Sequence, residues 1–228
     1  MHRVINASVP PLPATAEEEA YRFLLTGIRL GQFKPGDRLV PDEIASRLGM
    51  SRMPVRDAFR RLETQELLTI RPNRGAVVRG LNLDEATEVF EMRAVLEGLA
   101  ASVALKKMGT PEIDELERRL EAMGRYAGDL AEWIGAHRDF HLFLCGFSGR
   151  PRLIAQIAAL HVAIEPHMRL WLQSAPQPLA SHEDHALILD ALRRRRPELV
   201  EAVVRDHVIG TVPALAELMG AGGDSPPR

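Results

Sequence analysis

The segment from Pro41 to Leu67 constrains the fold most, because it places two helical patterns on either side of a glycine. PDEIASRLG opens with proline and acidic residues, as helix N-termini often do, and stops at Gly49, a residue type that commonly ends helices in a left-handed conformation. Ser51 then provides an N-cap for a second helix containing RMPVRDAFRRLE. A short helix, a tight glycine turn and a second helix predict a helix-turn-helix.

The second helix separates an apolar face from a stripe of arginines. Its apolar residues follow the i, i+3, i+4, i+7 pattern and are expected to face inward; they are Val55, Ala58, Phe59 and Leu62. Arg52, Arg56 and Arg60 are spaced by four and form an outward stripe. Recognition helices present their N-terminal residues to base edges. Arg52 and Arg56 are therefore the candidates for guanine O6 and N7, and Arg60 is expected to touch phosphate or nothing.

Charge is distributed unevenly along the chain. Residues 1–80 carry a net charge of +4 and the remainder −6, although the whole chain sums to −2. Residues 47–79 hold eight arginines against three acidic residues. On charge alone, a solvated basic face is the alternative to a nucleic-acid surface, but the order of elements favours DNA.

Elements on both sides of the helix-turn-helix complete a winged domain. An amphipathic helix is predicted over residues 16–30. LLTIRPNRGAVVRG has two short β-prone runs around a Pro-Asn-Arg-Gly turn, which predicts a hairpin. This hairpin would be a wing with Arg71 and Arg74 at its tip.

The remainder of the chain has helical patterns. Residues 81–219 are predicted to form an all-α bundle of six or seven helices for effector binding and dimerisation, and residues 220–228 a disordered tail. Residues 12–80 are predicted to be the DNA-binding domain. The expected fold class is therefore mainly α: an N-terminal winged helix-turn-helix with a small β-hairpin wing, followed by the helical bundle.

Four histidines are predicted to converge inside this bundle. His137 and His141 are one helical turn apart, His185 shares its face with leucines and an isoleucine, and His207 shares its face with valines. Asp139 should face away. Such a set can hold a metal, since imidazole suits Zn, Ni, Cu or Fe; we expect Zn, Ni or Fe. Hydrogen-bonded core histidines are the alternative.

Three stretches resemble the winged helix-turn-helix of the GntR family of bacterial transcription regulators. They are GQFKPGDRL, EIASRLGMSRMPVRDAFRRLETQELL and a wing ending in RG, within roughly residues 21–79. The resemblance implies DNA contacts from Ser51, Arg52, Arg56 and the wing around Arg74 and Gly75. Members often have an arginine where this chain has Asp42. A carboxylate there does not favour phosphate, so the operator is expected to differ from the commonest family sequences.

The second half is similar to the FCD domain, the effector domain of the FadR branch of that family. HRDFH, EDHALILDAL and RDHV carry the similarity, which implies His141, His185 and His207 as metal ligands. His137 stands where many members have an aspartate. Arg93 matches an arginine of the first effector-domain helix. It would bind a carboxylate effector, or alternatively pair with Glu97 at i+4.

These patterns predict a ligand-responsive transcription regulator, with repression relieved by the ligand as the expected polarity. It would bind a palindromic operator in double-stranded DNA as a homodimer and respond to a small carboxylate effector. The alternatives are a metal-dependent enzyme or metal sensor built on the bundle, and an architectural DNA-binding protein without an effector. No nucleophile motif, phosphate-binding loop or convincing general base indicates an enzyme. One cysteine and the lack of long apolar runs predict a cytoplasmic protein with no membrane partner.

Overall fold

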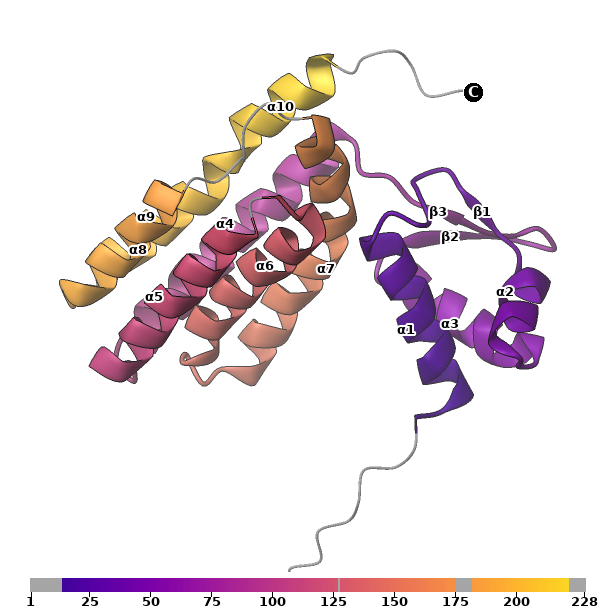
Figure 1. Ribbon diagram of the computed structural model, residues 1–228, viewed down its shortest axis with the longest axis horizontal. Helices are drawn as coiled ribbons and strands as arrows, with labels where there is room; N and C mark the ends of the chain where they lie inside the picture. The colour runs from indigo at the N-terminus through magenta and orange to yellow at the C-terminus, as the bar shows by residue number, and fades with distance from the viewer. Residues whose placement is uncertain (1–13, 127, 175–181, 222–228) are drawn as a thin grey trace, which may run out of the picture.

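Two bodies of structure are visible in Figure 1, joined by the short segment between β3 and α4. The computed structural model describes residues 14–126, 128–174 and 182–221. We refer to described residues up to 80 as the winged domain and to described residues from 81 as the helical domain. The predicted fold class, a winged helix-turn-helix followed by a helical bundle, is confirmed.

The winged domain contains three helices and three short strands. Its elements are α1 (Ala16–Arg29), β1 (Arg38–Leu39), α2 (Pro41–Leu48), α3 (Arg52–Thr64), β2 (Leu68–Arg71) and β3 (Gly75–Val78). α2 ends because Gly49 adopts a left-handed conformation with φ of +65°. Ser51 occupies the N-cap position of α3, but its side chain makes no capping hydrogen bond. The apolar faces of α1 and α3 pack together around Leu24, Phe59 and Leu62.

The wing is an antiparallel sheet with strand order β1-β3-β2. Arg71 pairs with Gly75 next to the turn, and Asn73 in the turn has a φ of +59°. Gly75 cannot be replaced easily, because a Cβ there would lie 2.2 Å from the carbonyl oxygen of Leu39. The predicted hairpin is therefore present. The third strand, β1, was not predicted, since two residues are too few to show alternation.

The helical domain has seven helices among the described residues. They are α4 (Leu83–Ala104), α5 (Thr110–Arg125), α6 (Leu130–Gly146), α7 (Pro151–Ser174), α8 (His182–Arg193), α9 (Pro197–Ile209) and α10 (Thr211–Ala221). α10 extends to Ala221, two residues beyond the predicted end of the bundle. The rest of the predicted tail, residues 222–228, and residues 12–13 lie outside the described residues.

Helix α4 is the central helix of the bundle. Its start is fixed by a capping box, in which Asn82 Oδ1 accepts from Glu85 N at 2.9 Å and Glu85 Oε2 accepts from Asn82 N at 3.0 Å. α4 contacts α6, α7, α9 and α10. As a result, α4 buries polar Arg93 and Glu97 together with its apolar residues.

The two domains meet where α1 approaches α7. Val162 of α7 packs against the core of the winged domain. Arg29, the last residue of α1, donates from Nη2 to Glu165 Oε1 of α7 at 2.7 Å. Helix α6 lies beside α7 in the bundle, so the interface is close to the helix that carries His137 and His141 (Figure 1).

Candidate functional site

The exposed face of α3 carries the predicted base-reading residues. Val55, Ala58, Phe59 and Leu62 are buried, as predicted, which fixes the rotation of the helix. Arg52, Arg56 and Arg60 are exposed on the opposite side. Local periodicity was therefore enough to orient this helix correctly.

Two of the three exposed arginines have acidic neighbours. Arg52 Nε lies 3.2 Å from Asp42 Oδ1, with the two side chains 65% and 63% exposed. Arg60 Nη1 lies 3.4 Å from Asp57 Oδ1. Arg56 has no ion pair among the described residues. Asp42 thus engages a residue expected to read bases.

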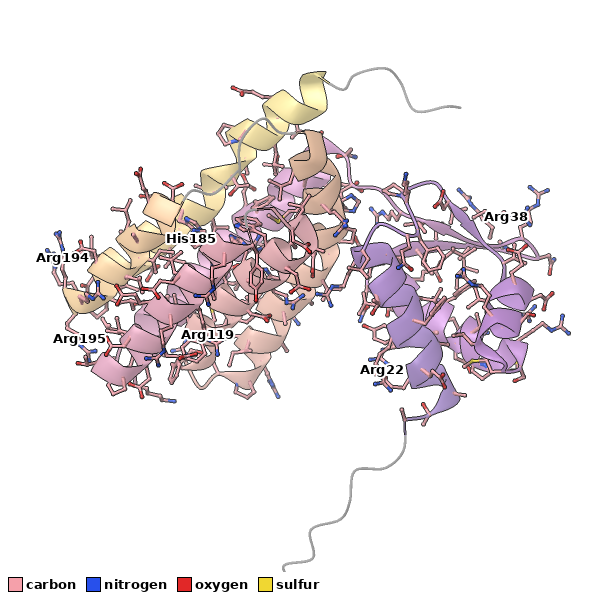
Figure 2. All side chains as sticks on the ribbon, in the orientation of Figure 1. Arg22, Arg38, Arg119, His185, Arg194 and Arg195 are labelled. Carbon is pink, nitrogen blue, oxygen red and sulfur yellow. The ribbon has the colours of Figure 1, made fainter. Side chains whose placement is uncertain are left out.

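The wing presents further positive charge beside α3. Arg71 and Arg74 are exposed on either side of the turn that leads to Gly75. Arg38 of β1 donates from Nε to the carbonyl oxygen of Arg74 at 2.8 Å and supports the wing from the neighbouring strand. Figure 2 shows Arg38 on the side of the sheet away from the helical domain. This role of Arg38 was not predicted, because β1 was not recognised.

Other arginines of the basic segment are structural. Arg61 Nη1 lies 2.7 Å from Glu18 Oε2, and its guanidinium group stacks 3.6 Å from the ring centroid of Tyr21, so it ties α3 to α1. Arg79 pairs with Glu66 and with Glu85 at the junction of the two domains. Charge alone would suggest that both arginines contact DNA, whereas their ion pairs show that both stabilise the fold.

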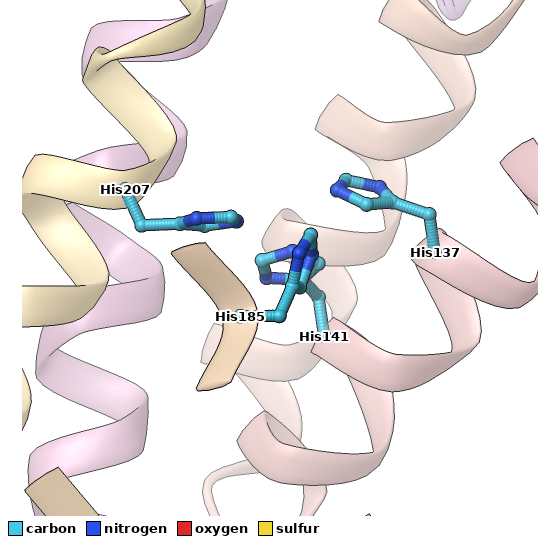
Figure 3. A group of neighbouring side chains, drawn as sticks. All are labelled: His137, His141, His185 and His207. Atoms are coloured by element: carbon cyan, nitrogen blue, oxygen red, sulfur yellow. The ribbon is translucent and has the colours of Figure 1, made fainter. Parts of the chain in front are cut away.

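The four predicted histidines converge inside the helical domain. Figure 3 shows the rings of His137 and His141 from α6, His185 from α8 and His207 from α9 turned toward one another. One ring nitrogen from each lies within 4.8 Å of the others. His137, His141 and His185 are buried, and His207 is partly buried. The predicted convergence is confirmed, and Figure 2 places His185 within the bundle.

The chemistry of this donor set fits a transition metal. Tetrahedral Zn–N bonds of 2.0–2.1 Å place ligand nitrogens about 3.4 Å apart, so small ring rotations would complete such a site. Nε2 of His141 is buried and has no hydrogen-bond partner among the described residues. Burial, followed by repulsion from His141, holds the pKa of His137 well below its usual value, and burial lowers the pKa of His207 to about 2. Both rings are therefore neutral, the form that binds metals.

Glu97 and Arg93 of α4 form a buried ion pair directly behind the histidine cluster. Arg93 Nε donates to Glu97 Oε1 at 2.8 Å, and the two side chains are 1% and 0% exposed. Glu97 Oε2 lies 2.8 Å from His141 Nδ1, and Glu97 Oε1 lies 3.0 Å from His161 Nε2. A carboxylate on Nδ1 leaves Nε2 of His141 as its metal-facing nitrogen, which is the usual support of a ligating histidine. Sequence reasoning paired Glu97 with Arg93 but missed its contacts with the histidines.

The same geometry shows how three neighbouring residues lie relative to the histidine cluster. Asp139 is exposed and pairs with Arg138 at 2.9 Å, so it faces away from the cluster as predicted. Cys145 is buried, and burial raises the pKa of its thiol well above the ordinary value. Its sulfur is not in the group of converging donors. Arg93, the predicted effector ligand, keeps a buried Nη1 without a hydrogen-bond partner in the described part of the chain.

A winged helix-turn-helix joined to a helical domain with a buried donor cluster defines a two-domain DNA-binding transcription regulator. Residues 16–78 match the family described as bacterial regulatory proteins, gntR family, and residues 88–210 match the FCD domain. The chain belongs to the GntR family and carries an FCD domain.

Named relatives agree with this assignment. The HTH-type transcriptional regulator McbR of Escherichia coli (strain K12) is 30% identical over 175 residues, 75% of this chain and 79% of McbR. The probable D-xylose utilization operon transcriptional repressor of Paenarthrobacter nicotinovorans is 30% identical over 208 residues, 90% of this chain and 91% of that protein. The solved structure of E. coli McbR/YncC superimposes with a TM-score of 0.72 at 26% identity, covering 92% of this chain and 96% of that one.

The comparisons also settle the enzyme alternative considered for the sequence. The family and these relatives are transcription regulators, so the prediction that the chain is not an enzyme is confirmed. Among the described helices, none is long and apolar enough to cross a membrane.

Proposed function

We propose that this DNA-binding regulator is a dimeric repressor of a palindromic operator, released by a small carboxylate that binds at a metal in the histidine cluster. One observation carries the proposal: four imidazoles from three helices meet in the domain attached to the winged helix-turn-helix. The name of the Paenarthrobacter relative, a repressor, supports the polarity. Ser51, Arg52, Arg56, Arg60, Arg71, Arg74 and Gly75 would form the DNA-binding face.

An apolar stripe on α4 supports a homodimer. Met92, Val95 and Leu99 are spaced along one face of this helix and are 41%, 49% and 37% exposed. Such a stripe on an otherwise charged surface fits a self-complementary contact between two copies around a two-fold axis. Two winged domains related by that axis would then meet a palindrome.

The residues around the cluster indicate the chemistry of the effector. A divalent ion, when bound there by the four imidazoles, would supply positive charge, and an anionic oxygen would join it as a fifth or sixth ligand. Four neutral imidazoles leave that charge uncompensated, and they disfavour Mg and Ca, which prefer oxygen ligands. Glu97 balances Arg93, whose Nη1 still offers a donor to a carboxylate. The effector must bind the two arrangements of the winged domains with different affinities in order to act.

Operator release by carboxylates tests the proposal. A preferred duplex would be selected from random DNA, and its affinity measured by fluorescence anisotropy with protein loaded with Zn, Ni or Fe. We expect one of a series of mono-, di- and tricarboxylates to weaken binding by wild-type protein and by the Asp139→Ala control, but not by His141→Ala. If a carboxylate weakened DNA binding by His141→Ala as much as it weakens binding by wild type, the histidine cluster would have no part in the mechanism.

A further inference from the structure

A cleft lies between the two domains and is lined by none of the four clustered histidines. Its volume is about 170 Å³, roughly that of six water molecules. The winged domain contributes Thr26 and Arg29 of α1, and the helical domain contributes Ile134 and Gly135 of α6 with Glu165 and Arg169 of α7. The cleft is therefore large enough for a small ligand that touches both domains.

The cleft carries more positive than negative charge. The carboxylate of Glu165 lies 2.7 Å from Arg29 Nη2 and 3.0 Å from Arg138 Nη1, and Arg138 also pairs with Asp139. Arg169 has no ion pair in the part of the chain that the structure describes. Among the residues that line the cleft, the guanidinium groups of Arg29 and Arg169 thus face one carboxylate, that of Glu165, and Arg169 is the unmatched one.

Unused donors point to the same ligand chemistry. Nε of Arg29 is buried and lacks a hydrogen-bond partner among the described residues. Arg169 reaches across to the winged domain, since a Cβ placed on Gly31 would lie 3.5 Å from its Cδ and Nε. A buried donor without a partner costs free energy, and guanidinium groups match carboxylate and phosphate oxygens in geometry and charge.

We propose that this cleft is a second ligand site, which binds a small carboxylate- or phosphate-bearing anion between Arg29 and Arg169. The anion would pair with the guanidinium groups of both side chains and would connect α1 to α7. Because Arg29 belongs to the winged domain and Arg169 to the helical domain, bound anion would favour the domain arrangement seen in this structure.

Calorimetric titration of the full-length, chelator-treated protein tests this site. The probes are inorganic phosphate in one arm and succinate in the other, at constant ionic strength balanced with chloride. We expect saturable binding of at least one anion at one site per chain, and the tighter arm identifies the ligand class. Arg169→Ala should weaken that binding roughly tenfold or more. Arg169→Gln, which keeps the length of the side chain, should show the same loss if Arg169→Ala is poorly folded.

Two control variants show whether the anion binds in the cleft or elsewhere on the protein. Arg152→Ala removes an exposed arginine from the same helix α7, and His141→Ala disables the histidine cluster. Both should bind the anion as wild type does. Absence of saturable binding in both arms, equal affinity in Arg169→Gln and Arg152→Ala, or loss of binding in His141→Ala would each overturn the proposal.

Discussion

Arg93→Met removes the guanidinium group that balances Glu97 inside the helical domain. The two side chains are 1% and 0% exposed and meet at 2.8 Å, so water cannot replace the lost partner. Removing one member of such a buried pair costs about 3–5 kcal/mol, because it leaves an uncompensated charge. We therefore expect Arg93→Met to lower the free energy of unfolding of the helical domain by about that amount.

Urea unfolding with chelator present provides the assay. Trp133 of α6 is buried, and Trp171, the second tryptophan of the chain, belongs to α7 of the same domain, so a change in tryptophan fluorescence reports unfolding of the helical domain. The double variant Arg93→Met, Glu97→Leu replaces the pair by apolar side chains and should recover part of the loss, since such replacements are often neutral. Recovery should be incomplete because Glu97 also contacts His141 and His161. A loss below about 1 kcal/mol in the single variant, or a double variant less stable than Arg93→Met, would refute the reasoning.

The same variant should change the response to acid. Although burial opposes ionisation, the charge of Arg93 holds the pKa of Glu97 well below its ordinary value of 4.5, and the neighbouring His141 and His161 act in the same direction. A depressed carboxyl pKa contributes stability that is present above the unfolded pKa and is lost as pH falls through the folded pKa. Wild type should keep this contribution at pH 5, in the urea assay. In Arg93→Met the loss should begin at higher pH, because Glu97 has lost its main counter-charge.

Three further tests concern the DNA face and the dimer. Arg56→Ala should lose about 1–3 kcal/mol of discrimination between operator and random duplex, whereas Arg60→Ala should weaken binding to both DNAs alike. Competition binding at fixed salt distinguishes the two variants. Full preference for the operator in Arg56→Ala would contradict its assignment to base reading. Asp42→Ala frees Arg52 from an exposed pair worth about 0–1 kcal/mol, so operator affinity in a salt titration should rise less than about tenfold and only at low salt. Val95→Glu should raise the dimer dissociation constant, measured by sedimentation, at least about tenfold. Leu187→Glu on α8, which also changes an exposed apolar position, should leave that constant unchanged. Equal effects of the two variants would show that the dimer contact does not lie on α4.

Local periodicity explains what could be predicted from the sequence. Gly49 and the apolar spacing from Val55 to Leu62 depend only on near neighbours, so the helix-turn-helix followed directly. His185 and His207 could be turned inward in the same way, because each shares a helical face with aliphatic residues. The convergence of the histidines then followed from the assumption that all these helical faces pack into one core.

Contacts between distant elements explain what the sequence did not reveal. β1 is two residues long and is defined by its pairing with β3, so no alternation marks it. Arg61 looks like a DNA-binding residue until Glu18 of α1 is placed beside it. Glu97 can be paired with Arg93 from an i+4 spacing, but its contacts with His141 and His161 join three helices and depend on the packing of the whole bundle.

The metal content of protein purified without a histidine tag tests the central claim most directly. Elemental analysis should find up to one Zn, Ni or Fe ion per chain in wild type and in Asp139→Ala, whose carboxylate lies outside the cluster. The metal should be lost in His141→Ala and His185→Ala, which each remove one of the converging imidazoles. The account would be contradicted if wild-type protein were free of metal, could not be reloaded with any of the three ions and still responded to its effector. The four histidines would then be core residues without a metal.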